Sequence, residues 1–508
     1  MAIIDSGIRP ENPLFSGENF EAPPADTLPT DDYCSEDPDF CNNKLIVARA
    51  ADIVEGFAVV EEEYESPLGF NGHGTHVAGT AVGNFGVMAE RDGAEAEISG
   101  VAPAAYLMAY KGLYATPANP ASSSGASSML ISMLEAALTD GADVVNNSWG
   151  GGAGGNPNGS VYEDVLEAMH DAGVVTVFAA GNDGPGDTTI GCPGCSDDVI
   201  TVAATTTDRF FANELTIEGD TSIGTIPARY SVGNPSIVFD SALTAPVVYA
   251  GEGAEANVEG CEEFAAGAFD GAIALISRGT CGFVTKIENA EAAGAVAVVI
   301  HNVDGRGEAP ILMGGLSPEQ TVPSFMVPAT PGQELATLIS ESEEAVNITI
   351  GAEVVRVVSE SLADIMADFS SRGPNGDPTF LKPNIAAPGV RIFSGESPDA
   401  PNHEGENFSF KGGTSMASPH VAGAAALLKQ MHPDWTAQQI KSALVTSSIR
   451  DVLKEDAATQ ADNFDMGAGR LDLPRATSVE LTYSDLSLVD GNCYLNCEMS
   501  ITVTNTSD

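Results

Sequence analysis

Three residues far apart in the chain carry side chains that could act together in nucleophilic chemistry. Ser415 lies in "GTSMASPHVAG", His73 in "NGHGTHVAGT" and Asp5 in "IIDSGI". A serine hydroxyl is a weak nucleophile, so it needs a base within hydrogen-bond reach and an anion that holds the base in the correct tautomer. His73 could be that base and Asp5 that anion. Taken singly, each residue has a plainer interpretation, as a helix cap, a structural histidine and a turn-capping aspartate.

An attack by Ser415 would create an oxyanion, which needs hydrogen-bond donors already in place. Ser415 stands where a glycine-led stretch meets an alanine-rich apolar segment, so we expect it at the start of a helix. Backbone N–H groups and the helix dipole favour an anion there, so a cap position and a nucleophile are compatible. Asn182 in "AAGND" is the candidate side-chain donor, with a turn residue after Gly181 as the alternative. Gly72 and Gly74 beside the histidine would let backbone pass close by.

The elements that must position these residues alternate in type along the first part of the chain. Runs such as "MAII", "ADVVNNS", "VVTVFAAG" and "VITVAAT" are typical of buried strands. Between two of them, a helical spacing with a glycine stop is formed by Val161, Val165, Leu166, Met169 and Gly173. This pattern predicts an α/β fold, doubly wound, with a mainly parallel sheet covered by helices on both faces. In such sheets, chemistry belongs at the carboxyl ends of the strands.

The pattern changes near residue 211 and returns near residue 358. Between these points, runs such as "PVVYAG", "GAIALISRG" and "GAVAVVIHN" are rich in Gly, Pro and β-branched residues. We therefore predict a β-rich module at 211–358, with its core at about 235–350, inserted between two parts of one α/β domain at 1–210 and 359–478. Period-two alternation over 479–508 predicts the start of a truncated β-sandwich. "MAIID" starts directly as a strand, so we also expect a fragment edge at the N-terminus.

The charge balance argues against two classes of partner. The chain has 508 residues, with 21 Lys+Arg against 72 Asp+Glu and a formal net charge of −51. Such a surface repels nucleic-acid phosphates and anionic membranes, so we expect binding to neither. The apolar runs are far shorter than the ~20 residues of a spanning helix, so no membrane span is predicted.

Eight cysteines fall into close sequence pairs: Cys34 with Cys41, Cys192 with Cys195, Cys261 with Cys281, and Cys493 with Cys497. An even count with local partners predicts disulfides and an oxidising compartment. The alternative for "CPGC" is a redox or zinc motif. A zinc site would want a second such pair or nearby histidines, and the histidines lie elsewhere in the sequence.

The chain resembles the subtilisin-like serine proteases. The resemblance rests on the three motifs in the order Asp, His, Ser, together with "DVVNNSWGG" and "FAAGNDGP". It covers roughly residues 1–210 and 359–476. It implies a subtilisin-like fold and a catalytic set made of Asp5, His73, Ser415 and Asn182.

The same resemblance implies how a peptide would bind. The backbone of an extended substrate would pair with Ser148, Trp149 and Gly150 on one side, and with Gly125 and Ala126 on the other. The specificity pocket would be lined by small uncharged residues, which indicates an apolar or broad preference: Ala179, Ala180 and Gly181.

The resemblance extends to the insertion and the tail. "ISRGTC", "GAVAVVIHN" and the spaced Cys261 and Cys281 are similar to a protease-associated domain, and the tail resembles the start of a fibronectin type III-like domain. In the family, the inserted module influences substrate access or binding.

The function implied is that of a secreted serine endopeptidase that cleaves protein or peptide substrates through an acyl-enzyme. Two alternatives stay open: an inactive protease scaffold that serves as a binding protein, and a peptide ligase that uses the same three residues. No cofactor is needed for the chemistry. The resemblance implies structural calcium, while metal sites are unassigned, and it implies an upstream propeptide in the precursor.

The remaining histidines and one sequon receive no functional role. His76 and His420 lie inside the motifs but off the reacting positions, so we expect them to pack and hydrogen-bond. "NNS" at Asn146 matches a glycosylation sequon, but it lies within the predicted substrate-strand motif, so we expect no glycan there. Four histidines are expected at the surface or in loops: His170, His301, His403 and His432.

Overall fold

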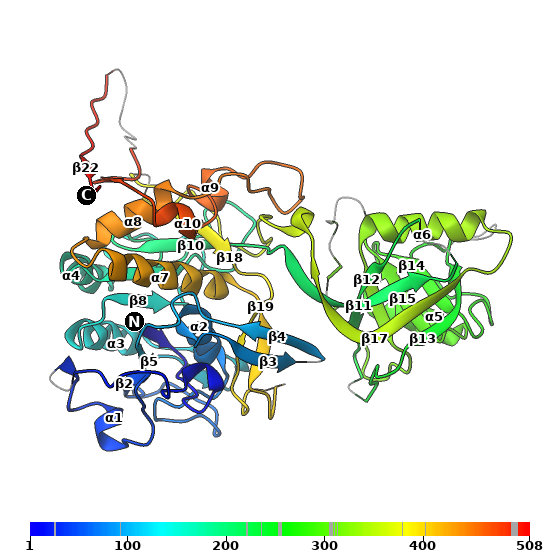
Figure 1. Ribbon diagram of the computed structural model, residues 1–508, viewed down its shortest axis with the longest axis horizontal. Helices are drawn as coiled ribbons and strands as arrows, with labels where there is room; N and C mark the ends of the chain where they lie inside the picture. Colours follow the sequence, from blue (N-terminus) through cyan, green and yellow to red (C-terminus); the bar gives the residue numbers. More distant parts are fainter. Residues whose placement is uncertain are drawn as a thin grey trace.

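A parallel sheet forms the centre of the larger of two units (Figure 1). The computed structural model describes all residues except 25–26, 92, 220–221, 235, 252–256, 304–307, 309, 312, 378, 402, 489–495 and 508. Seven described strands pair in parallel, in the spatial order β18 (Ile385–Pro388), β10 (Ile200–Thr205), β9 (Val175–Ala179), β8 (Val144–Asn147), β1 (Ala2–Asp5), β5 (Leu107–Lys111) and β2 (Leu45–Ala50). The predicted α/β class with a parallel sheet is confirmed.

Helices cover both faces of this sheet because alternate strand residues point to opposite sides. Ile3 packs in one apolar cluster and its neighbour Ile4 in the other. The first cluster includes α2 (His73–Val82), α7 (Thr414–Met431) and α8 (Ala437–Thr446). The second includes α3 (Ser127–Thr139) and α4 (Glu163–Asp171). Strand ends at one edge of the sheet therefore meet the starts of α2 and α7.

The helix predicted near residue 165 shows where sequence periodicity fails. Val165, Leu166 and Met169 of α4 are buried, and Gly173 has a φ of +80° just after the helix, as predicted. Val161 was predicted on the same face, which is wrong. It precedes the helix, and 67% of its surface is exposed, because α4 begins only at Glu163.

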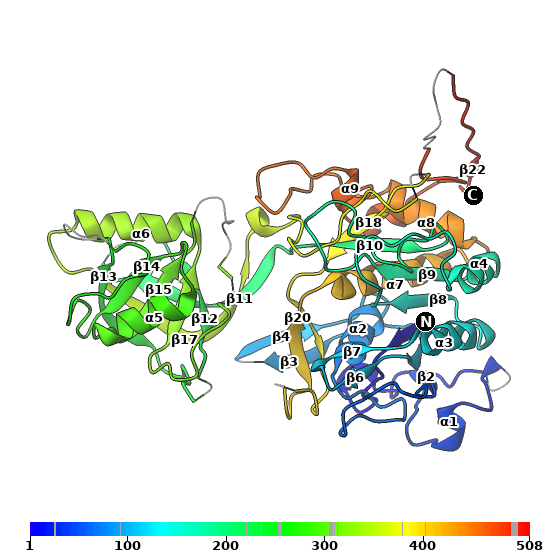
Figure 2. The same cartoon turned by 180° about the vertical axis from the view of Figure 1, so that it is seen from behind.

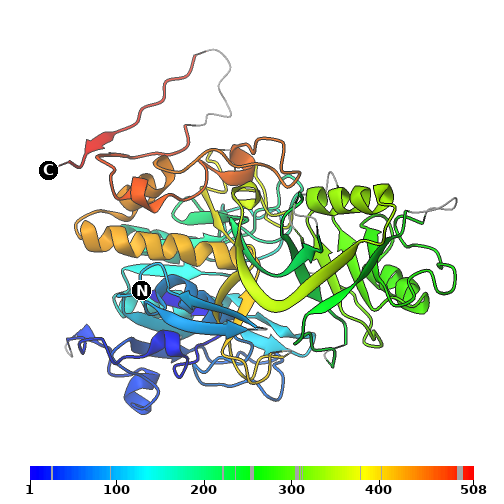
Figure 3. The same cartoon turned by 45° about the vertical axis from the view of Figure 1, so that its right-hand side comes forward.

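A second unit lies between β10 and β18 in the chain. Its strands close into a barrel, in the order β11 (Arg209–Ile217), β12 (Ile226–Ser231), β16 (Ser324–Val327), β15 (Ala297–His301), β14 (Ile273–Ser277), β13 (Leu243–Tyr249) and β17 (Asn347–Val358). Helices α5 (Phe283–Ala292) and α6 (Ala329–Glu341) pack against it. The barrel lies to one side of the α/β unit, and Figure 3 shows β17 curving along it. That this unit is a protease-associated domain stays a prediction.

Hairpins and short helices complete the α/β unit. Figure 2 shows the hairpin of β3 (Val87–Arg91) and β4 (Ala94–Ile98) extending towards the barrel, and Gly93 lies close to Val354 of β17. The tail forms an antiparallel pair, β21 (Leu481–Tyr483) with β22 (Val503–Asn505), and its identity as the start of a β-sandwich stays a prediction. The remaining elements are β6 (Tyr114–Thr116), β7 (Asn119–Ser124), β19 (Ile392–Gly395), β20 (Phe408–Lys411), α1 (Tyr33–Glu36), α9 (Asn463–Met466), α10 (Leu473–Ala476), and the 3₁₀ turns Pro13–Phe15 and Glu360–Leu362.

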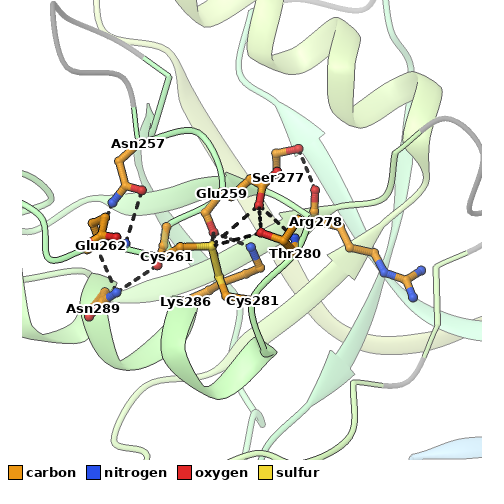
Figure 4. Close-up of a disulfide and its surroundings, with 11 residues drawn as sticks. Asn257, Glu259, Cys261, Glu262, Ser277, Arg278, Thr280, Cys281, Lys286 and Asn289 are labelled. Atoms are coloured by element: carbon orange, nitrogen blue, oxygen red, sulfur yellow. Dashed lines mark hydrogen bonds between the residues drawn. A yellow bond between two sulfur atoms is a disulfide. The ribbon is translucent and has the colours of Figure 1, made fainter.

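Three predicted disulfides are present: Cys34–Cys41, Cys192–Cys195 and Cys261–Cys281. Figure 4 shows the last of them beside Glu259, whose Oε2 accepts hydrogen bonds from the Thr280 N–H and hydroxyl, each at 2.8 Å. The predicted pair of Cys493 with Cys497 includes a residue outside the described part of the chain. Among the described residues, none of the helices has the length and apolarity needed to cross a bilayer.

Candidate active site

Asp5 and His73 meet at the carboxyl edge of the sheet. Asp5 ends β1 and is 1% exposed, while His73 begins α2 with 28% of its side chain exposed. Asp5 Oδ1 lies 2.7 Å from His73 Nδ1 and also accepts the Ser6 N–H at 2.7 Å. A carboxylate can only accept, so Nδ1 carries the proton and Nε2 is left as the acceptor. The ring therefore presents its basic nitrogen away from Asp5.

A small polar network fixes the start of α2. Asn71 Oδ1 accepts the His73 N–H at 3.1 Å and the Ser6 hydroxyl at 2.8 Å, and Ser6 Oγ accepts the Gly74 N–H at 3.0 Å. A Cβ at Gly74 would collide with the Gly7 carbonyl oxygen, so the predicted need for close backbone approach is confirmed there. The role of Asn71 was missed in the sequence, although it is the first residue of the histidine motif.

Ser415 is the second residue of α7, which begins at Thr414 after Gly413 as N-cap. The interpretation of Ser415 as the N-cap is therefore wrong by two positions, although its place in the first helical turn is as predicted. Its hydroxyl donates to the Ser148 carbonyl at 3.0 Å, and the Ser148 hydroxyl donates to the Ser415 carbonyl at 2.7 Å. These two bonds fix the start of α7 to the end of β8.

The strand register places Ser148, which is hydrogen-bonded to Ser415, beside Asp5. Because Ile4 pairs with Asn147, Asp5 is level with Ser148 on the adjacent strand, about 5 Å away. In this conformation the Ser415 hydroxyl donates to the Ser148 carbonyl. Among the contacts of the described residues, it makes no hydrogen bond to His73. Such bonds are often long in a site without substrate and tighten when one binds. Ser415 is thus bonded to the residue that follows the strand next to the one carrying Asp5.

The Asn182 side chain is oriented by the residue before Ser415. Asn182 Oδ1 accepts the Thr414 N–H at 2.9 Å and the Thr414 hydroxyl at 3.0 Å. An amide that accepts through its oxygen on one side directs its two N–H donors to the other. The N–H of Ser415 is among the first donors of α7, which have no acceptor within the helix. Both groups could donate to an oxygen beside Ser415.

The side chains of Ser148 and Trp149 in the predicted substrate strand are buried. Trp149 is 9% exposed, its indole N–H donates to the Ile4 carbonyl at 3.0 Å, and its ring packs on Phe178 and Tyr162. Ser148 is buried and Gly150 is exposed, so polar contact with a peptide from this strand would come from backbone groups. Gly125 and Ala126, predicted on the other side of a bound peptide, connect β7 to α3 immediately before the helix start and are partly exposed.

The predicted pocket residues are bonded to a segment that the sequence did not indicate. Ala179 and Ala180 are buried at the end of β9, and Gly181 follows with a φ of +106°. The Ala180 carbonyl accepts the Gly191 N–H at 3.3 Å, and the Cys192 carbonyl accepts the Gly151 N–H at 2.7 Å. Segment 191–195, closed by the Cys192–Cys195 disulfide, thus joins the pocket residues to the substrate strand.

The remaining histidines follow the predictions with one exception. Burial lowers the pKa of His76 and of His420, and each bonds a backbone carbonyl, from Ile392 and Met416 respectively. His301 was expected at the surface or in a loop, which is wrong: it ends β15 of the barrel and is 1% exposed. The other three are partly exposed: His170, His403 and His432.

Two further sites can be judged from burial and composition. Asn146 is fully buried and accepts the Ser418 hydroxyl at 2.7 Å, so the sequon is not available to a glycan, as predicted. Within the described ranges, no three His, Cys, Asp or Glu side chains gather as a metal site.

The amino-acid sequence is similar to those of known proteins. The chain matches the subtilase family over residues 1–469. The minor extracellular protease Vpr of Bacillus subtilis (strain 168) is 34% identical over 424 residues, covering 82% of this chain and 47% of Vpr. Subtilisin-like protease SBT1.6 of Arabidopsis thaliana is 30% identical over 511 residues, covering 95% of this chain and 64% of the relative.

A crystal structure of the psychrophilic subtilisin-like protease Apa1 from the Antarctic psychrotroph Pseudoalteromonas sp. AS-11 aligns with a TM-score of 0.49 and 19% identity, covering 94% of this chain and 91% of that one. The chain spans about half to two thirds of the length of the two curated relatives. By the family match over most of its length, the chain belongs to the subtilase family.

Proposed function

We propose that this chain is a secreted serine endopeptidase. The observation that carries the proposal is the 2.7 Å bond between Asp5 and His73, formed one strand away from the Ser148–Ser415 hydrogen bonds. In a subtilase, this set of side chains has the types needed for an acyl transfer at serine. Membership of the family and the chemistry of the site thus point to the same reaction.

In the proposed reaction, Ser415 Oγ attacks the peptide carbonyl carbon while His73 Nε2 takes the hydroxyl proton. Asp5 holds the ring and stabilises the imidazolium that forms. The oxyanion receives hydrogen bonds from Asn182 Nδ2 and the Ser415 N–H. His73 then gives its proton to the leaving amine, and an acyl-enzyme remains on Ser415. Water, deprotonated by the same imidazole, hydrolyses that ester and restores the serine.

Substrate binding would follow from the main-chain groups along the site. An extended peptide would lie between Ser148–Gly150 and Gly125–Ala126, which gives affinity without reading side chains. The residue before the cleaved bond would enter the pocket lined by the segment Ala179–Gly181. Small uncharged walls favour apolar or varied side chains there. The three disulfides and the name of the extracellular Bacillus relative support secretion.

Three further features are proposed from the family resemblance. An upstream propeptide would precede the mature enzyme, structural calcium would bind outside the catalytic residues, and the barrel insertion would act on substrate access. Each is separable from catalysis: loss of thermal stability on chelation with unchanged initial rate would support a structural metal.

Product analysis tests the proposal against its alternatives. We expect mass spectrometry to find new peptide termini after incubation with an unfolded protein, and none with the Ser415→Ala variant. An added peptide amine would be joined to the new carboxyl ends if the enzyme were mainly a ligase. Intact substrate with a correctly folded enzyme would favour the inactive binding protein and refute the proposal.

A further inference from the structure

A buried carboxylate that the proposed reaction does not use lies against the start of the helix that carries His73. Glu396 follows β19, and its side chain is 0% exposed. Its Oε1 fills the space that a Cβ on Gly72 would need, and the same oxygen accepts the Ser397 N–H at 2.9 Å. Gly72 is the N-cap of α2 and has no side chain to cap it. Glu396 thus supplies negative charge where the helix dipole is positive.

The other oxygen of Glu396 connects this carboxylate to the strand that leads to Ser415. Glu396 Oε2 accepts the Ser409 hydroxyl and the Lys411 ammonium, both at 2.7 Å. Lys411 ends β20, and residues 412–414 alone separate it from Ser415. The Glu396–Lys411 pair therefore joins the helix of the proposed base to the start of the helix of the proposed nucleophile.

The ionisable groups around this pair come from several elements. His403, in the connection from β19 to β20, has its Nε2 4.0 Å from Glu396 Oε2. His76 on α2 is buried and bonds two backbone carbonyls, and burial, followed by the charge of Lys411, lowers its pKa. Asp5 on β1 supplies the other negative charge at the base. A change at Glu396 would therefore leave the charge of Lys411 uncompensated beside the helix that carries His73.

We propose that Glu396, paired with Lys411, is a positioning residue that holds and electrostatically supports the catalytic base. The proposal rests on the proposed function of His73. The carboxylate of Glu396 packs against the N-terminus of α2 and holds it in place. It also offsets the positive charge of Lys411, which would otherwise oppose the imidazolium formed during the reaction. Position 72 must remain glycine because the carboxylate occupies the space of a side chain there, and because its φ is +76°.

The charge of the pair gives a signed prediction. Glu396→Gln keeps the shape of the side chain and one acceptor oxygen, but it leaves the ammonium of Lys411 without its counter-ion. The acid limb of the kcat/KM profile should move to lower pH by about one unit, and kcat should fall about tenfold, with KM nearly unchanged. The double change Glu396→Gln with Lys411→Met removes both charges. It should return the acid limb to within a few tenths of a unit of its original pH, because a neutral pair, like the ion pair, places no net charge beside the base.

A matched control removes a buried carboxylate elsewhere. Asp140 pairs with Arg49 and has 4% of its side chain exposed. It follows the far end of α3, about 20 Å along the helix from Ala126 at the substrate edge, beyond the screening length at physiological salt. Asp140→Asn should therefore leave the acid limb in place even if stability falls.

The measurement is the pH dependence of kcat and KM for peptide cleavage by these four forms, with labelling by a fluorophosphonate to count folded sites. An acid limb that stays in place in a labelled Glu396→Gln enzyme would overturn the proposal. So would a double variant that keeps the full shift, since packing and not charge would then be at work. Absence of labelling in the unaltered enzyme would instead refute the proposed function, whatever Glu396 does.

Discussion

Asn182 offers a prediction in which activity and stability should change in opposite orders. Its side-chain oxygen receives two hydrogen bonds from Thr414, while its N–H donors are directed away from that residue. Two substitutions separate the role of the accepting oxygen from that of the N–H donors. Asn182→Ala removes both, whereas Asn182→Asp keeps an oxygen for Thr414 and replaces the donors with negative charge.

The two hydrogen bonds set the expected stability. Asn182→Ala loses both, at about 0.5–1.5 kcal/mol each, so the free energy of unfolding should fall by about 1–3 kcal/mol. Asn182→Asp keeps both and places a carboxylate at the N-terminus of α7, which contributes about 0.3–1 kcal/mol of stabilisation. Urea unfolding should therefore rank the aspartate variant at or above the natural protein, and the alanine variant below it.

Activity should follow the opposite order for the two variants. Loss of one oxyanion donor costs about 10²–10³ in kcat, a size already known for subtilisin and carried over to this relative. Asn182→Asp should lose more, because a carboxylate repels the developing oxyanion. Steady-state kinetics on a peptide substrate gives kcat and KM for both. A stable aspartate variant with natural kcat would refute the assignment of Asn182 as a donor.

Three more predictions concern the base, the pocket and buried charge. Asp5→Asn should lower kcat by about 10⁴ with little change in the melting temperature, because the amide no longer holds the required tautomer of the imidazole; a loss below tenfold would contradict this. Replacing Cys192 and Cys195 by serine should raise KM for apolar peptides several-fold, whereas the same change at Cys261 and Cys281 in the barrel should leave KM unaltered. Burial lowers the pKa of Lys44 to about 7. Below that pH the residue is protonated in the folded and the unfolded state, so the free-energy cost of burying its charge is fully present. Above it the unfolded state binds more protons, so the free energy of unfolding should rise up to pH ~10, by at most about 5 kcal/mol. Urea unfolding at pH 7 and pH 9.5 should show a smaller rise in the free energy of unfolding for Lys44→Met than for the natural protein.

Local patterns were enough to predict much of the α/β unit. Mostly apolar runs such as residues 175–179 became buried strands, because a parallel sheet covered on both faces needs no polar alternation. Cysteines three to twenty positions apart became disulfides, because short loops bring such pairs together. The same patterns did not predict where helices begin: Val161 fits the period of α4 but precedes its first turn.

Contacts between distant segments could not be predicted. The Gly72–Glu396 contact depends on how the connection from β19 folds under α2, and nothing in "SGESPDAPNHEGENFSFKGG" indicates it. The hydrogen bond from the Gly151 N–H to the Cys192 carbonyl, close to the predicted pocket residues, joins segments separated by α4 and β9. His301 was misplaced because its strand continues one residue beyond the apolar run.

Covalent labelling mapped to a residue tests the central claim most directly. A fluorophosphonate should react with the folded enzyme in one-to-one ratio, and peptide mapping should find the adduct on Ser415. His73→Ala should slow that reaction by several orders of magnitude without unfolding the protein. An adduct on another residue, or equal labelling of the Ser415→Ala variant, would contradict the assignment of this serine as the nucleophile.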